Sequence, residues 1–264
     1  MVRRRAGQAA EGPAWSRETL HDPHGRADKA DRVRAMFNAI APTYERVNAL
    51  ATFGRDGAWR RRAVTVAHVR PGEVVLDVAC GTGDMIRAFA RGLPAPAKII
   101  GVDFAQGMLD SGDYAGITVP IELLRADALD LPLADETADV ISCAFGVRNF
   151  QDLDAGLREM YRVARVGARV VILEFARPTN TVLRWWYERY CHTVLPWLGA
   201  WVARDAEGAY RYLPRSVETF ECRSGMLRRL AAAGFADVRA QAMNLGGVVL
   251  YSGLKPEGRG SRCA

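Results

Sequence analysis

Residues 74–90, VVLDVACGTGDMIRAFA, decide the fold of this 264-residue chain. An apolar strand, Val74–Ala79, runs into a turn with Gly81 and Gly83, and a helix over Met85–Arg91 follows. In open parallel sheets, ligands bind beyond the carboxyl ends of the strands. Glycines there let a ligand approach the backbone, and the next helix presents its first N–H groups. The stretch therefore predicts a ligand-binding turn.

The same alternation of strand and helix continues along the chain. Apolar runs such as Arg169–Phe175 are typical of strands in a parallel sheet buried on both faces. Further strands are expected at Lys98–Asp103, Ile121–Ala126, Asp139–Phe145, Phe235–Ala242 and Val248–Lys255, and helices at Ala105–Ser111, Leu153–Val163 and Ser224–Ala233. The last two strands flank Gly246-Gly247 and read as a hairpin. The pattern predicts an α/β fold: a mostly parallel seven-stranded sheet, helices on both faces and a C-terminal antiparallel strand at its end.

Composition divides the chain into a tail over residues 1–27, a single domain over 28–255 and a short tail over 256–264. The first tail is rich in Arg, Gly, Ala and Pro without an apolar period, which predicts disorder. Helical spacing begins at Asp28, and Pro42 is expected to end or kink that helix. A second helix is expected at Ala58–Val69. Residues 179–221 break the alternation and form an insertion.

Charge and cysteine content limit the class of protein. The net charge is +6 and the pI about 9.3, and dispersed solubilising charge explains these values more readily than nucleic acid or an anionic membrane. The five cysteines are scattered without a CxxC pair, so neither a disulfide framework nor a zinc site is indicated, and a cytoplasmic location is expected. No apolar run approaches the roughly 20 residues of a membrane span, and the start lacks a secretory signal.

The turn at 81–83 lacks the features of the common nucleotide loops. A dinucleotide site would continue as GxGxxG, but the sixth position is Ile86, and no Lys-Ser/Thr follows as in triphosphate loops. Asp77, Asp84 and Asp103 would repel a pyrophosphate. These carboxylates favour a cationic ligand.

Two aspartates at later strand ends identify that ligand. Asp103, 22 residues past Gly81, can accept hydrogen bonds from both hydroxyls of a ribose. Asp127 ends the third strand, where it can accept from the exocyclic amine of adenine. An adenosine that carries a positive sulfonium is S-adenosyl-L-methionine (SAM), which we expect as cofactor.

Eight motifs then occur in one order: VLDVACGTGD, GVDFAQGML, DALDLPLAD, AFGVRNFQD, EMYRV, LEFARP, AYRYLPRSV and GGVVLYSGLK. From about Asp28 to Lys255 the chain resembles the ubiquinone/menaquinone biosynthesis C-methyltransferases (demethylmenaquinone methyltransferases), which are class I SAM-dependent enzymes. The resemblance implies a Rossmann-like class I fold. It also implies methyl transfer to a ring carbon of a prenylated quinol, with 2-demethylmenaquinol to menaquinol as the expected case.

The resemblance also implies the cofactor site. Its cofactor positions match Thr82, Asp103, Asp127 and Ala128, beside Asp77, Gly81 and Gly83 of the turn. Many members have a serine where this chain has Ala144. Loss of one hydrogen bond there is expected to weaken cofactor binding by about 1 kcal/mol.

Three residues are the candidates for catalysis. An aromatic carbon becomes nucleophilic when the neighbouring phenol loses its proton. We expect Arg148 to lower the pKa of that phenol by its charge, Asn149 to orient the oxygen and Tyr44 to relay the proton through water. Tyr44 belongs to the helical segment 28–70, which is expected to close over the site as a lid. Glu174 is expected to pair with an arginine.

The insertion is rich in aromatic residues and arginine. Trp185, Trp186, Trp197 and Trp201 fall within 17 positions, a mixture that suits the boundary between lipid tails and headgroups. We expect peripheral contact with the inner face of the cell membrane. A homo-oligomer or a complex of quinone-biosynthesis enzymes stays open.

Alternatives remain within and outside this enzyme class. The acceptor could be another small aromatic or lipid molecule, because fold does not fix substrate. A nucleic-acid methyltransferase is disfavoured, since the chain has no Asn-Pro-Pro-Tyr motif. A non-catalytic adenosyl- or lipid-binding protein is disfavoured because Gly81, Gly83, Asp103 and Arg148 are all present.

Overall fold

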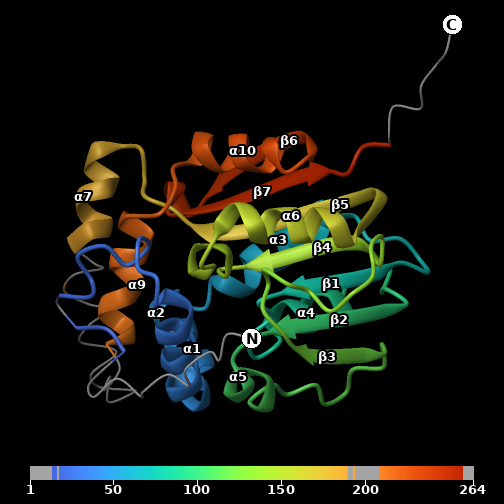
Figure 1. Cartoon of the computed structure of the whole chain (residues 1–264), viewed down its shortest axis with the longest axis horizontal. Helices are drawn as coiled ribbons and strands as arrows, with labels where there is room; N and C mark the ends of the chain where they lie inside the picture. Colours follow the sequence, from blue (N-terminus) through green and yellow to red (C-terminus); the bar gives the residue numbers. More distant parts are fainter. Residues whose placement is uncertain (1–13, 17, 190–192, 194–207, 258–264) are drawn as a thin grey trace, which may run out of the picture.

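The computed structural model describes residues 14–16, 18–189, 193 and 208–257, and its centre is one seven-stranded sheet (Figure 1). The strand order is β3-β2-β1-β4-β5-β7-β6. The strands are β1 (Val74–Val78), β2 (Lys98–Asp103), β3 (Ile121–Arg125), β4 (Ala138–Ala144), β5 (Ala164–Phe175), β6 (Ala236–Met243) and β7 (Val248–Leu254). β1 to β5 pair in parallel, and β7 is antiparallel to both β5 and β6. The predicted sheet is confirmed, although the antiparallel strand lies between β5 and β6 and not at the edge.

Helices cover both faces of the sheet because alternate strand residues point to opposite sides. On one face, Leu157 and Met160 of α6 (Leu153–Val163) and Leu230 of α10 (Arg223–Ala232) join the apolar core that contains Leu76. On the other face, α3 (Asp56–Ala67) and α4 (Asp84–Ala90) pack over the layer that contains Val75. The short helix α5 (Gln106–Asp110) follows β2.

A group of helices lies beyond the carboxyl ends of the parallel strands (Figure 1). This group contains α1 (Lys29–Ile40), α2 (Tyr44–Ala51), α7 (Thr181–Arg189) and α9 (Ala209–Glu218). Pro42 lies in the 3₁₀ turn η1 (Ala41–Thr43) that separates α1 from α2, which confirms the expected break. Two further 3₁₀ turns adjoin the sheet: η2 (Val147–Asn149) follows β4, and η4 (Asn244–Gly246) precedes β7.

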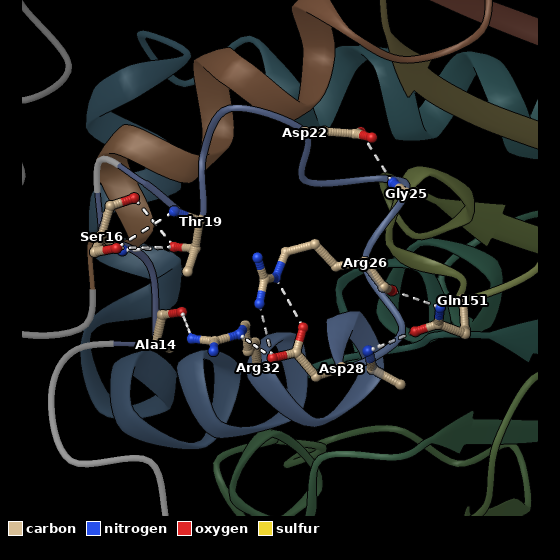
Figure 2. Close-up of polar contacts among 10 residues, drawn as sticks. Ala14, Ser16, Thr19, Asp22, Gly25, Arg26, Asp28, Arg32 and Gln151 are labelled. Atoms are coloured by element: carbon tan, nitrogen blue, oxygen red, sulfur yellow. Dashed lines mark hydrogen bonds and ion pairs between the residues drawn. The ribbon is translucent and has the colours of Figure 1, made fainter.

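The expectation of a disordered tail over residues 1–27 is wrong for its described part. Residues 14–16 and 18–28, here called the N-terminal strap, cross the same end of the sheet (Figure 2). Figure 2 shows Gln151 bonded to the Arg26 carbonyl (2.8 Å), and Arg32 bonded to Asp28 (2.7 Å) and to the Ala14 carbonyl (2.8 Å). This packing could not be predicted from the sequence because Trp15, which is completely buried, stacks on Tyr212, almost 200 positions away.

Several expectations fall outside the described residues, among them Trp197 and Trp201 of the insertion and the tail beyond residue 257. Among described helices, none combines the length and apolar character needed to cross a bilayer. Within the described ranges, no three His, Cys, Asp or Glu side chains cluster as a metal site.

Candidate active site

The first of two adjoining cavities opens at the carboxyl ends of β1, β2 and β4. Its empty space of about 640 Å³ includes solvent at its open mouth. The strand ends contribute Ala79, Gly81, Asp103, Asp127, Ala128, Ala144 and Phe145, and the helical side contributes Phe37, Tyr44, Asn149 and Gln151. Five of the eight predicted cofactor residues therefore line one cavity: Gly81, Asp103, Asp127, Ala128 and Ala144.

Asp103 and Asp127 reach this cavity in different environments. Asp103 is buried, and its two carboxylate oxygens accept from the N–H groups of Gly81 (2.8 Å) and Ala105 (2.9 Å). Burial raises the pKa of Asp103 to about 6, against the effect of these donors. Asp127 is exposed, and its Oδ1 accepts from the Leu129 N–H (3.0 Å), which fixes the direction of the carboxylate.

The glycine turn is built differently from the expectation. Gly81 has a φ of +56° and lines the cavity. Gly83 has a φ of +87°, and a Cβ there would lie 2.4 Å from the hydroxyl of Tyr114, so its missing side chain makes room for Tyr114. Thr82 is buried, and its Oγ1 has no hydrogen-bond partner among the described residues. Neither Thr82 nor Gly83 lines the cavity in the described part of the chain.

Asp77 also lies beneath the cavity and not on its surface. It is almost completely buried in β1 and accepts a hydrogen bond from Ser142 Oγ of β4 (2.8 Å). Burial raises the pKa of Asp77 to about 7, since neither that bond nor Arg60 offsets the loss of water. Once ionised, Asp77 can act on a bound cation through its charge.

These residues fit S-adenosylmethionine. Two carboxylates at neighbouring strand tips can accept from hydroxyl and amino groups, and the buried Thr82 Oγ1 has unused hydrogen-bonding capacity. Ala144 lines the cavity but offers no hydroxyl.

The second cavity lies beside the first and shares Phe37, Tyr44 and Phe145 with it. Its other lining residues are Met36, Ile40, Asn48, Thr52, Asp56, Arg60, Arg148, Phe175, Ala209, Tyr212 and Leu213. Apolar and aromatic side chains dominate, with a few polar groups. This composition suits a flat aromatic ring with polar substituents.

Arg148 is a buried cation in the wall of the second cavity. Its Nη1 donates to the Phe145 carbonyl (2.7 Å) and is ion-paired with Glu174, and its guanidinium lies 5.4 Å from the centre of the Phe175 ring. Burial alone would lower the pKa of Arg148, but the carboxylate of Glu174 raises it, so the guanidinium stays charged. The expected pairing of Glu174 with an arginine is present.

Asn149 and Tyr44 lie near Arg148, where the two cavities adjoin: Asn149 lines the first cavity, Arg148 lines the second, and Tyr44 lines both. Asn149 is buried, and its Oδ1 accepts from the Tyr212 hydroxyl (2.9 Å), which leaves its Nδ2 as the donor end. Tyr44 is half-buried and edge-on to Phe37, with 5.9 Å between ring centres. Burial raises the pKa of Tyr44, while a side-chain hydrogen bond with Asn48 lowers it.

Sequence reasoning missed the polar wall of the second cavity. Tyr44 and Asn48 lie four residues apart on α2, Asp56 and Arg60 lie four residues apart on α3, and Thr52 lies in the turn between the two helices. Within each helix, an interval of four places both side chains on one face. Asp56 pairs with Arg60 (2.8 Å) and accepts from Thr52 (3.1 Å). That interval of four was the available signal.

Comparisons with known proteins show the family to which the chain belongs. The model of the ubiE/COQ5 methyltransferase family matches residues 26–255. A relative from Thermus thermophilus, named demethylmenaquinone methyltransferase, is 40% identical over 225 residues and covers 84% of this chain and 100% of its own. One from Geobacter sulfurreducens, named ubiquinone/menaquinone biosynthesis C-methyltransferase UbiE, is 39% identical over 235 residues, covering 86% of this chain and 90% of its own.

Solved structures share the fold at lower identity. A SAM-dependent methyltransferase from Thermotoga maritima superposes with a TM-score of 0.56 at 18% identity, covering 84% of this chain and 98% of that one. At this identity the likeness concerns the fold alone.

Proposed function

Because the chain belongs to the ubiE/COQ5 methyltransferase family and is a SAM-dependent methyltransferase, we propose that its acceptor is a prenylated quinol, methylated on a ring carbon. The conversion of 2-demethylmenaquinol to menaquinol is the favoured reaction, and a benzoquinol precursor of ubiquinone is the related substrate. One observation carries the proposal: a cavity with carboxylates at strand tips adjoins an apolar cavity with a buried arginine, and both share Tyr44 and Phe145.

Asp103 and Asp127 are proposed to hold the ribose and the adenine, with Gly81, Ala128 and Ala144 in contact and Asp77 acting by charge from below. When bound, SAM supplies an electrophilic methyl group. Asp77 and Asp103 would stabilise its positive sulfonium by their charge.

The second cavity is proposed to favour the ionised form of the quinol. A fixed guanidinium stabilises a phenolate more than a phenol, so Arg148 lowers the pKa of the substrate hydroxyl. The donor Nδ2 of Asn149 would orient the same oxygen. Tyr44, at the junction, would pass the released proton to water, and one proton reaches solvent for each methyl transferred. The helical segment 28–70, with Phe37 and Tyr44 over the cavities, would serve as the lid.

Contact with a membrane is part of the proposal. Several large apolar side chains are exposed, here called the apolar rim: Leu50, Phe53, Val182, Trp185, Trp186 and Leu245. These side chains come from three segments that meet: Arg55 donates to Asn244 (3.2 Å), and the backbone of Pro178 approaches Gly246. An exposed apolar patch beside an apolar cavity suits a substrate whose tail lies in lipid.

Flotation with liposomes tests this contact. The intact protein is expected to float, and the triple variant Phe53→Ser/Trp185→Ser/Trp186→Ser to stay in the lower fraction. Leu93→Ser is the matched control, because Leu93 is 98% exposed yet lies before β2, at the amino ends of the strands. No flotation of the intact protein, even with anionic lipid, would contradict the contact.

The proposed acceptor is tested with purified protein, SAM and reduced substrates of short prenyl length. Mass spectrometry is expected to show a methylated 2-demethylmenaquinol, and a demethylated ubiquinol precursor measures the second acceptor. Asp103→Ala should lose most of this activity. Failure to methylate either quinol, by a protein that binds SAM, would refute the proposed substrate.

A further inference from the structure

The N-terminal strap places a tryptophan directly behind the proposed catalytic residues. Trp15 is completely buried, and its ring stacks on Tyr212 of α9 with 4.3 Å between ring centres and 23° between planes. Within the described residues, Trp15 Nε1 donates no hydrogen bond. The contact with Tyr212 is therefore one of ring against ring, which fixes the plane of the tyrosine without a polar anchor.

Tyr212 connects the stacked Trp15 ring to Asn149 of the proposed active site. Its ring lines the second cavity and its hydroxyl donates to Asn149 Oδ1 (2.9 Å). The other end of the Asn149 amide faces the Phe145 carbonyl at 3.4 Å, too long for a strong hydrogen bond. Tyr212 is thus the main polar contact that holds the orientation of the Asn149 amide in the described structure.

We propose that Trp15 is a positioning residue for methyl transfer, acting through Tyr212 on Asn149. The stacked indole holds the tyrosine hydroxyl where it binds Oδ1, which keeps one Nδ2 hydrogen near the Phe145 carbonyl and leaves the other for the substrate oxygen. This inference rests on the proposed function, because Asn149 must contact the quinol oxygen for its orientation to matter. Misplacement of a reacting group by about 1 Å can cost about 100-fold in rate.

The strap contacts α9 at several points besides Trp15, and these contacts hold Trp15 in place. The Arg215 guanidinium donates to the carbonyls of Leu20 (3.1 Å) and His21 (2.8 Å), and His24 Nε2 donates to the Ser216 carbonyl (2.9 Å). At Gly208, which has a φ of +74°, a Cβ would lie 2.3 Å from the Trp15 carbonyl oxygen, so any side chain there would lift the strap.

The other end of the strap is fastened beside the first cavity. Gln151, which lines that cavity, accepts from the Ala30 N–H (2.9 Å) and donates to the Arg26 carbonyl (2.8 Å), as Figure 2 shows. Lys29 is buried and donates to the Phe150 carbonyl (2.5 Å). The strap thus joins residues of both cavities, and loss of its anchor should disturb methyl transfer more than binding of either ligand.

A double-mutant cycle separates positioning from simple core packing. The variants are Trp15→Ala, Trp15→Phe, Tyr212→Phe and Trp15→Ala/Tyr212→Phe, all measured well below their melting temperatures. Tyr212→Phe keeps the stacked ring but removes the hydroxyl that binds Asn149. Glu18→Ala, at an exposed strap position, is the control and should match the parent.

We expect Trp15→Ala to lower kcat at saturating substrates by about 30- to 100-fold, with KM and the Kd for SAM changed by less than about threefold. Trp15→Phe, which retains an aromatic ring, should restore kcat to within about fivefold of the parent. Tyr212→Phe removes the contact with Asn149 completely and should lower kcat by about 100-fold, at least as much as Trp15→Ala. In the Tyr212→Phe background, Trp15→Ala should add less than about threefold, because the contact it supports is already absent.

Three results would overturn the inference: losses that multiply in the double variant, no rescue by Trp15→Phe, or an unchanged kcat in Trp15→Ala. Hydrogen exchange at the η2 amides gives a readout independent of turnover, and exchange should rise in Trp15→Ala and return toward the parent in Trp15→Phe. If Asn149→Ala leaves kcat intact, the proposed function of Asn149 fails. If Asn149→Ala lowers kcat and Trp15→Ala does not, only the strap inference fails.

Discussion

Affinity for SAM is expected to rise with pH between 5.5 and 8, because two buried carboxylates hold protons in the free protein. Burial raises the pKa of Asp77 to about 7 and that of Asp103 to about 6, and each carboxylate is a better partner for a cation when ionised. A bound sulfonium would lower both pKa values. Binding should therefore release protons near neutral pH.

The size of the effect follows from the pKa of Asp77. With a pKa of about 7, the ionised fraction rises from about 3% at pH 5.5 to about 90% at pH 8. If tight binding requires the carboxylate, the Kd for SAM should fall by about 30-fold over this interval. Asp103, with its lower pKa, contributes most of its change below pH 7.

Calorimetry at several pH values, in buffers of different ionisation enthalpy, measures both the Kd and the protons released. S-Adenosylhomocysteine is the matched ligand, because it keeps the adenosine and lacks the sulfonium charge. Its Kd should change by less than about fivefold, and Asp77→Asn should flatten the curve for SAM. Equal pH dependence for both ligands, or an unchanged curve in Asp77→Asn, would refute the reasoning.

Three further predictions concern the same end of the sheet. Arg148→Lys should lower kcat by about 100-fold and change the Kd for SAM by less than about threefold, because an ammonium group cannot reproduce the contacts of the planar guanidinium with Glu174, the Phe145 carbonyl and the Phe175 ring. Equal losses in rate assays and calorimetry would contradict this role. Asp77→Asn should raise the free energy of unfolding, measured in urea, by up to about 4 kcal/mol at pH 8 and by little at pH 4. Between about pH 4 and 7 the folded protein keeps the Asp77 proton that the unfolded chain releases, so the stability of the parent falls as pH rises. An equal gain at both pH values would argue against this reasoning. Gly83→Ala should destabilise by about 2 kcal/mol or more, because its Cβ meets the Tyr114 hydroxyl at positive φ, and an unchanged melting temperature would disprove the clash.

Elements with strong local patterns were predictable from sequence. The helix expected at Leu153–Val163 and the strand expected at Lys98–Asp103 have those bounds in the structure, because their apolar periodicity matches the face that each buries. The gathering of Asp103, Asp127 and Arg148 near one end also followed, since the carboxyl ends of parallel strands share an edge.

Features that depend on distant partners were not predictable. Gly83 was expected beside a ligand, but only the structure shows Tyr114 in the space that its Cβ would fill. Trp15 stood alone in a segment without periodicity, and its burial depends on Tyr212. The position of β7 inside the sheet also lies beyond local pattern, because a hairpin signal does not say which of its strands pairs with β5.

The seat of the strap on α9 also bears on how the chain matures. Contacts such as Arg215 to Leu20 span 195 positions, so their formation carries the entropic cost of closing a long loop. During translation the strap leaves the ribosome long before α9 and has to wait undocked until that helix arrives. An affinity tag fused just ahead of Ala14 would hinder the docking of the strap on α9. A tag after β7, which ends at the opposite end of the sheet, would leave that docking undisturbed (Figure 1).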